Sequence, residues 1–319
     1  MREYNAAQCA AALQAQNNIL ILTHRNPDGD TLGCAFALLR ALLSCGKTAR
    51  VACSDEIPQK YAYMWAGISV PDFTPDYIVA VDIADEKLLG EPLYTAYHGK
   101  VNLCIDHHLS NTQYADRLFL RECAATCELV YAVLAASNTE ITKEIADCLY
   151  TGLSTDTGCF RYSNTTPNTY RLAANMLEAG ADAAEINRVM FETKTRTYLK
   201  LEELVLNNLQ MYFDSKCAVV TVTQEMFRQS GSCESECDGI ASLSRRIEGV
   251  TVGVTLRERE DGTFKVSLRT YAPVDAAKIC GKMGGGGHAR AAGCELPADN
   301  FEAEKQRLLE IIREELEGI

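Results

Sequence analysis

The sequence predicts an α/β protein, with a first domain in which helices flank a mostly parallel sheet and a second, smaller α/β domain. Three observations predict this class. Short apolar runs alternate with helical segments in the first half of the chain, a second alternation begins at Cys217, and a length of 319 residues gives room for about two domains.

The first half of the chain predicts the larger sheet. Its strands are short and apolar at nearly every position, as strands buried on both faces of a parallel sheet are. The first predicted helix, 31–45, ends before Gly46, a residue type that commonly terminates helices. The expected strands are 18–23, 51–54, 77–83 and 101–106, and the later helices are 124–137, 143–154, 168–180 and 195–211.

The second alternation predicts the smaller domain. Its expected strands are 217–223, 250–258, 264–270 and 289–296, with helices at 274–283 and 301–316. No stretch rich in Pro, Gly and Ser marks a flexible linker. We therefore expect a first domain at 1–188, a helical linker at 189–215 and a second domain at 216–319.

The charge balance restricts the kinds of molecule that the protein is expected to bind. The chain has 31 Lys and Arg against 43 Asp and Glu, a net charge of −12, which disfavours a surface that grips long nucleic acid through its phosphates. Residues 1–215 carry 17 basic and 26 acidic residues (−9), whereas 239–290 carry 9 and 5 (+4). This difference favours a small anion bound in the second domain.

We expect a cytoplasmic protein that does not enter a membrane. No stretch reaches the roughly 18 apolar residues that a membrane span needs, and the N-terminal sequence lacks the order of a signal peptide. The 14 cysteines are scattered and contain no C-x-x-C pair. We interpret most of them as small buried hydrophobic residues of a reduced compartment.

Aspartate and histidine concentrate in four segments, which contain three of the five histidines. Three of these segments follow predicted strands, whose carboxyl ends meet at one edge of a parallel sheet, and the fourth must arrive from a helix or loop. A turn at Asp28-Gly29-Asp30 and a helix cap at Asp82 are the simpler alternatives. The segments are His24 to Asp30, Asp82, Asp106-His107-His108 and Asp156.

Four carboxylates gathered in one site predict a cation centre. They cannot all stay ionised unless positive charge neutralises them, and two divalent cations supply that charge. Carboxylates together with imidazoles suit Mn²⁺, and less strongly Fe²⁺, Co²⁺ or Zn²⁺. Because two such cations clamp the attacking and leaving oxygens at phosphorus, the predicted reaction is phosphoester hydrolysis.

These motifs resemble those of the DHH phosphoesterase superfamily. The matching strings are HRNPDGDTLG, VAVD, IDHHLSN and STDTG, and GGGGHARAAG is similar to the glycine-rich signature of the DHHA1 domain. The length and the two-domain layout most resemble the NrnA-type oligoribonucleases, or nanoRNases, which are also 3′-phosphoadenosine-5′-phosphate (pAp) phosphatases. The resemblance implies two-metal hydrolysis of oligonucleotides of about two to five residues to mononucleotides, and of pAp to AMP.

The resemblance also implies the metal ligands. Asp82 would bridge the two cations. The first would be held by His24, Asp28 and Asp82, and the second by Asp30, Asp82, His107 and Asp156.

Further roles follow from the same resemblance. His108 would lie against the scissile phosphate and Asp106 would orient a ligand histidine. Asn111 matches an Asn that follows the triplet in many members, and we count it among the substrate-binding residues. Cys34 stands where the family commonly has Ser, and a thiol is a weaker hydrogen-bond partner. This departure puts a contact between that position and substrate phosphate in question.

The glycine run at 284–287 has two interpretations. Successive glycines are often a flexible turn, but they also let several backbone N–H groups converge on one anion. Its place in the basic region favours the anion. The resemblance assigns Arg269, Gly285, Gly286, Gly287 and His288 to the terminal phosphate of the substrate.

Several alternatives stay open on the sequence. The main one is a cyclic di-AMP or pApA phosphodiesterase, followed by a pyrophosphatase and an exonuclease of the RecJ type. A nucleotide-binding sensor without catalysis is the non-enzyme alternative, and it would be expected to lack a metal ligand, whereas all six are present. Homodimers are common in the family, and the oligomeric state, polarity of attack and native metal stay open.

Overall fold

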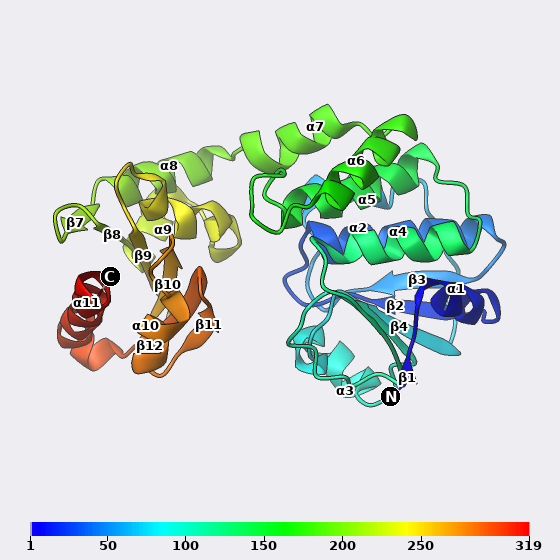
Figure 1. Ribbon diagram of the computed structural model, residues 1–319, viewed down its shortest axis with the longest axis horizontal. Coiled ribbons are helices and arrows are strands. Elements are labelled where there is room, and N and C mark those ends of the chain that lie inside the picture. The colour runs from blue at the N-terminus through cyan, green and yellow to red at the C-terminus, as the bar shows by residue number, and fades with distance from the viewer. Residues whose placement is uncertain (1, 319) are drawn as a thin grey trace. The chain divides into compact units, whose positions relative to one another are not determined.

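The first sheet is parallel throughout, with strand order β1-β6-β5-β4-β2-β3. The computed structural model, which describes residues 2–318, is drawn in Figure 1. Because β3 and β4 lie on opposite sides of β2, the sheet has a switch point between β2 and β4, where ligands of such sheets bind. The strands are β1 (Arg2–Glu3), β2 (Ile19–Leu22), β3 (Ala49–Ala52), β4 (Tyr77–Val81), β5 (Leu103–Asp106) and β6 (Arg117–Leu120).

Helices cover both faces of this sheet. In Figure 1, α2, α4 and α5 lie together on one side, and α2 packs along both α4 and α5. The helices are α1 (Ala6–Gln14), α2 (Gly29–Ser44), α3 (Leu93–Tyr97), α4 (Thr126–Ala136), α5 (Lys143–Asp156), α6 (Pro167–Glu178) and α7 (Ala183–Asn187), which continues into a π-helical turn, Arg188–Glu192. Short 3₁₀ helices lie at Gln59–Met64 and Glu86–Leu89.

The side chains of β2 show why the strands are apolar at every position. Ile19 and Ile21 belong to the core under α2, α4 and α5, whereas Leu20 and Leu22 belong to a second core on the opposite face. All four are fully buried. Alternate residues of a strand point to opposite faces, so a sheet covered on both sides needs apolar residues throughout.

The second sheet is mixed, with strand order β11-β12-β10-β9-β8-β7. The pair β8 and β9 is parallel and its other pairs are antiparallel. The strands are β7 (Gln210–Tyr212), β8 (Cys217–Val222), β9 (Val252–Glu258), β10 (Phe264–Thr270), β11 (Gly286–His288) and β12 (Ala291–Leu296). The helices are α8 (Arg196–Leu206), α9 (Gln224–Ser230), α10 (Ala276–Lys282) and α11 (Phe301–Glu317), with 3₁₀ segments at Glu234–Ser242, Ser244–Arg246 and Ala298–Asn300.

The predicted fold class is confirmed, and the main errors lie at short elements. The sequence pattern did not predict α1, α7, the two-residue edge strand β1 or the strand β6, which lies between β1 and β5. It also extended one helix through residue 211, whereas α8 ends at Leu206 and the chain then enters β7.

The chain divides into two compact units, the first ending at Thr193 and the second beginning at Lys194. The first carries the parallel sheet and the second the mixed sheet. The finer boundaries at 188 and 216, with a helical linker between them, stay a prediction. Among the described residues, no helix has the length and apolar character needed to cross a membrane.

Candidate metal centre

The four polar segments meet at the switch point of the first sheet. His24 follows β2, Asp82 follows β4, and the Asp106-His107-His108 triplet begins on the last residue of β5. Asp156 arrives as the last residue of α5. The structure places their ligand atoms within 4.8 Å of one another in three groups: His24, Asp28 and Asp82; Asp30, His107 and Asp156; and Asp82, His107 and His108.

Asp82 lies at the centre of these groups. It is 3% exposed, and its backbone is left-handed, with φ of 61°. Its Oδ2 lies 3.8 Å from Nε2 of His24, and its Oδ1 lies 3.7 Å from Nε2 of His107 and 3.6 Å from Nδ1 of His108. Asp82 does not cap the following helical turn, whose N-cap residue is Asp85. Its position suits a carboxylate shared by two cations.

Backbone carbonyls orient two of the histidines. Nδ1 of His24 lies 2.8 Å from the carbonyl oxygen of Arg25, and Nδ1 of His107 lies 3.0 Å from that of Cys123. Since a carbonyl only accepts, each Nδ1 carries the hydrogen of the neutral ring. Nε2 is then left to face the carboxylates, as in a metal-ligating histidine.

Asp28 and Asp30 are placed by the start of α2. Asp28 is the N-cap residue, and its Oδ1 accepts hydrogen bonds from the N–H groups of Asp30 at 3.0 Å and Thr31 at 3.1 Å. The same oxygen lies 3.7 Å from Nε2 of His24. The segment Asp28-Gly29-Asp30 therefore forms the start of α2 rather than an isolated turn, and it presents two carboxylates to the site.

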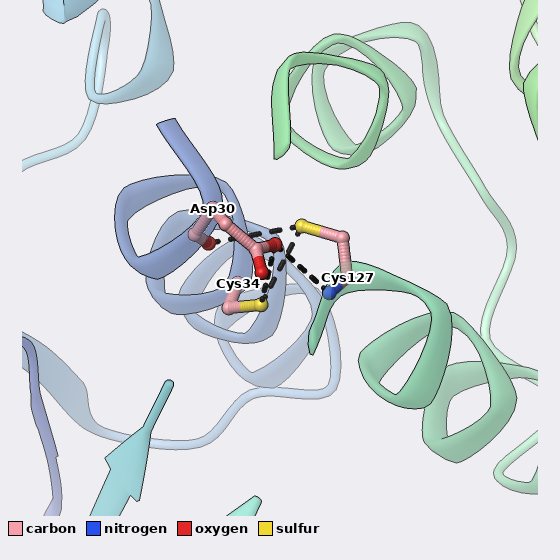
Figure 2. A group of neighbouring side chains, drawn as sticks. All are labelled: Asp30, Cys34 and Cys127. Carbon is pink, nitrogen blue, oxygen red and sulfur yellow. Dashed lines mark hydrogen bonds between the residues drawn. The ribbon is translucent and has the colours of Figure 1, made fainter. Parts of the chain in front are cut away.

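Asp30 is held against a second helix, α4. It is 1% exposed, and its two oxygens accept hydrogen bonds from the N–H groups of Thr126 at 2.6 Å and Cys127 at 3.0 Å. Figure 2 shows it between Cys34 and Cys127, whose sulfur atoms lie 3.4 Å apart. A carboxylate has about four lone-pair sites, so these contacts leave acceptor capacity for a cation.

Cys34 belongs to the core of the first unit rather than to an exposed surface. Its side chain is fully buried, and its thiol lies 3.7 Å from Oδ1 of Asp30. Burial raises the pKa of the Cys34 and Cys127 thiols well above the usual range, so both stay protonated. Gly152 of α5 allows this packing, because a Cβ there would lie 2.2 Å from the sulfur of Cys127. The thiol therefore supports Asp30.

Asp106 holds His108 and is itself held by Asn111. Oδ1 of Asp106 lies 2.7 Å from Nδ1 of His108, and Oδ2 accepts a hydrogen bond of 2.6 Å from Nδ2 of Asn111. Burial acts to raise the pKa of Asp106, but the hydrogen bonds from His108 and Asn111 outweigh it and keep the pKa low. Asn111, which the resemblance assigned to substrate, is buried, and its amide also donates to the carbonyl of Ile83.

The ionisation of the cluster shows that it needs positive charge. Burial and the neighbouring carboxylates raise the pKa of Asp30 well above its usual range, and burial raises that of Asp156 to about 7. Burial opposes protonation of His24 and His107, yet contacts with Asp28 and with the Cys123 carbonyl outweigh it and raise both pKa values to about 9. Without cations, protons bound by Asp30, Asp156, His24 and His107 therefore offset the negative charge.

The metal-free protein is expected to lose stability as the pH rises from about 6.5 to about 9. The stabilisation from protonated His24 and His107 is complete below the ordinary pKa of 6.5 and is lost as the pH rises towards 9. The contribution of Asp156 has the same sign, complete below 3.8 and lost as the pH rises through 7. The stabilisation by added Mn²⁺ is expected to increase with pH, because Mn²⁺ binding displaces these protons.

Melting temperatures measured with EDTA and with Mn²⁺ across this pH range test the prediction. The difference between the two curves removes the contribution of titrating groups elsewhere in the chain. A difference that stays constant with pH would contradict the ionisation described for the cluster.

The second half of the glycine run, Gly286 and Gly287, belongs to an edge strand rather than to a flexible turn. Gly286–His288 form β11, which pairs with β12. A Cβ on Gly285 would lie 2.1 Å from the carbonyl oxygen of Gly293, and one on Gly287 would lie 2.6 Å from Cα of Ala292. Close approach of the two strands therefore explains two of the glycines without a ligand.

Arg269 and His288 lie on one row of the second sheet. Arg269 of β10 is in register with Ala291 of β12, and Ala291 is in register with His288 of β11. Residues paired in this way point to the same face of a sheet. His288 is exposed and Arg269 is half-buried, so this face can offer an imidazole and a guanidinium to an anion.

The fold and this arrangement of donors define an α/β protein built from a DHH catalytic-type domain and a DHHA1 domain. The model of the DHH family, N-terminal domain, matches residues 18–153, and that of the DHHA1 domain matches residues 214–318. The chain belongs to the DHH family.

Relatives whose sequence or structure aligns with almost the whole chain support this assignment. The chain is 35% identical, over 93% of its length and 90% of the relative's, to the bifunctional oligoribonuclease and PAP phosphatase NrnA of Thermus thermophilus. It is 25% identical, over 95% of its length and 48% of the relative's, to the cyclic-di-AMP phosphodiesterase GdpP of Geobacillus thermodenitrificans. An exopolyphosphatase-related protein from Bacteroides fragilis has the same fold, with a TM-score of 0.84, 24% identity and coverage of 98% and 96% of the two chains.

Proposed function

We propose that the protein is a metal-dependent phosphoesterase that hydrolyses short oligonucleotides to mononucleotides and pAp to AMP. The observation that carries this proposal is the pair of donor groups that surround Asp82 at the switch point of the first sheet. The similarity to NrnA of Thermus thermophilus over 93% of the chain supports the substrate class.

The donor set fits two divalent cations. His24, Asp28 and Asp82 would hold one. Asp30, His107 and Asp156 would hold the other together with Asp82, whose Oδ1 lies 3.7 Å from Nε2 of His107. Carboxylates that raise one another's pKa and imidazoles with Nε2 facing them are the environment that such cations neutralise. The mixture of oxygen and imidazole donors favours Mn²⁺. When bound, the pair would activate water and stabilise charge on the phosphate.

His108 is the protein group best placed to assist the reaction. Its Nδ1 is engaged by Asp106 at 2.7 Å, and its side chain is 41% exposed. Nε2 is therefore the atom that would donate a hydrogen bond or a proton to the phosphate. Asp106 would fix the ring, and Asn111 would fix Asp106, so we propose that Asn111 is a positioning residue rather than a substrate contact.

The second unit would bind the end of the substrate. We propose that Arg269 and His288 hold its terminal phosphate on the shared face of β10, β12 and β11, with Gly285, Gly286 and Gly287 nearby. The net charge of +4 at residues 239–290 supports an anion there.

Substrate length is expected to matter strongly, with dinucleotides to pentanucleotides cleaved at least about tenfold faster per end than 20-mers. The reason is the charge of −9 on residues 1–215, which offers no extended basic surface for the phosphates of a longer strand. Initial rates at equal concentrations of 5′-labelled RNA of each length measure the preference. Equal rates per end would contradict it.

The substrate class is tested by comparing a dinucleotide, pAp, pApA and cyclic di-AMP with Mn²⁺ and after chelation. The proposed function predicts metal-dependent release of mononucleotides from the dinucleotide and of AMP from pAp. Turnover confined to cyclic di-AMP or pApA would instead support the phosphodiesterase alternative, which the similarity to GdpP keeps open. Binding without turnover of any of the four would support a nucleotide sensor.

A further inference from the structure

The chain just before and at the start of α4 contacts three of the six proposed metal ligands and is linked to a fourth through Asn164, although none of the sequence motifs includes it. This positioning segment is Cys123–Cys127. Its residues donate or accept hydrogen bonds through the backbone and through the side chains of Thr126 and Cys127. The ligands that it contacts, directly or through one amide, are Asp30, Asp82, His107 and Asp156.

Thr126 is the residue that joins the two groups of ligands. Its backbone N–H donates to Oδ2 of Asp30 at 2.6 Å, and its hydroxyl donates to Oδ1 of Asp82 at 2.8 Å. The residue is fully buried, so water does not compete for either contact. Thr126 therefore contacts both carboxylates and can set the distance between Asp30 and Asp82.

The N-terminus of α4 strengthens the contact between Asp30 and the positioning segment. The N-cap residue of α4 is Ala125, which has no side-chain acceptor to offer. The carboxylate of Asp30 takes that place by accepting from the N–H groups of Thr126 and Cys127, and Figure 2 shows its contact with Cys127. The partial positive charge at a helix N-terminus favours a carboxylate there.

The rest of the positioning segment supports the neighbouring ligands. The carbonyl of Cys123 accepts from Nδ1 of His107, which turns Nε2 towards Asp82 and Asp156. Nδ2 of Asn164 donates to the carbonyls of Ala124 at 3.0 Å and of Asp156 at 3.1 Å, which ties the end of α5 to the same segment.

We propose that Thr126 is a positioning residue of the metal centre, which sets the separation of Asp30 and Asp82 so that they suit adjacent divalent cations. The inference rests on the proposed metal centre. The hydroxyl matters most for Asp82, whose left-handed backbone at the end of β4 leaves its side chain to be oriented by contacts from outside the strand. Contacts that orient a ligand typically change metal affinity about 10- to 100-fold when they are lost.

The test compares Thr126→Val, which removes the hydroxyl and keeps the shape and the backbone N–H, with Thr126→Ser, which keeps the hydroxyl. Affinity for Mn²⁺ is measured by calorimetric titration of the full-length protein, independently of turnover. We expect Thr126→Val to bind Mn²⁺ about 10- to 100-fold more weakly and Thr126→Ser to stay within about threefold of the unchanged protein.

Thr151→Val is the matched control. Thr151 is also a fully buried helical threonine, and its hydroxyl contacts Tyr63 and the carbonyl of Asp147 rather than a proposed ligand. This variant is expected to lower the melting temperature in metal-free buffer and to leave Mn²⁺ affinity unchanged.

Each other outcome overturns a defined part of the proposal. Unchanged Mn²⁺ affinity in Thr126→Val, or equal losses in the Val and Ser variants, would show that the hydroxyl does not position Asp82. Thr126→Val that fails to fold even with Mn²⁺ would assign Thr126 a purely structural role. An unchanged protein that binds no Mn²⁺ would overturn the metal centre itself.

Discussion

Replacing Asp82 with asparagine is expected to lower kcat by more than about 100-fold and to weaken Mn²⁺ binding, since even supporting residues of metal sites typically contribute 10- to 100-fold. Asp82 lies within reach of His24, His107 and His108, and it is the carboxylate shared by two of the donor groups. An amide keeps the shape and one oxygen acceptor but removes the negative charge. Steady-state rates on a dinucleotide and calorimetric titration with Mn²⁺ measure the two effects.

Asparagine is the appropriate substitute because of the backbone at this position. With φ of 61°, Asp82 is in the left-handed region, which Asn tolerates better than alanine does. Asp214→Asn is a matched control, since Asp214 is a second left-handed aspartate, with φ of 51°, in the hairpin between β7 and β8. Near-full kcat in Asp82→Asn would show that the two-cation assignment is wrong.

His108→Gln is expected to lower kcat about 100- to 10,000-fold while Mn²⁺ affinity stays nearly unchanged. The hydrogen bond from Nδ1 to Asp106 raises the pKa of His108 to about 9 in the metal-free protein and fixes the ring. Glutamine retains a polar side chain of similar reach but cannot transfer a proton. The expected signature is therefore a loss in kcat without a loss of metal, measured by the same two methods.

His98→Gln is the control for this substitution. His98 makes the same kind of contact, with Nδ1 2.7 Å from Oε2 of the buried Glu86, but it lies outside the donor groups. We expect this variant to keep full activity. If His108→Gln lost Mn²⁺ as strongly as Asp82→Asn, His108 would instead belong to the ligands, which its distance of 3.6 Å from Asp82 would permit.

The sequence predicted the site better than it predicted the contacts that support the site. His24, Asp82 and His107 could be assigned to one place because each follows a strand, and the ends of parallel strands share one edge. The contact of Asp30 with Thr126 spans 96 residues, and that of Cys34 with Cys127 spans 93. No local pattern encodes contacts of that range, because they depend on how closely α2, α4 and α5 pack.

Two individual residues show the same limit. Asn111 follows the histidine triplet and was expected to reach substrate, whereas its amide is enclosed by Asp106 and Ile83. The glycine run was expected to be a loop, but Gly285 and Gly287 lie against β12. In both cases the contacts depend on the direction of a side chain or on the approach of a neighbouring strand, which the local sequence does not encode.

The sequence by itself determined the α/β class, the apolar strands and the identity of the polar residues at their ends, because these depend on periodicity and composition over a few residues. Only the tertiary structure decided which oxygen of Asp30 or Asp82 meets which donor, because α4 brings Thr126 to both from a distant part of the chain. Gly152 illustrates the physical reason. A side chain there would collide with Cys127 and Asp30, so the separation of the helices, and with it the geometry of the ligands, is set by packing volume.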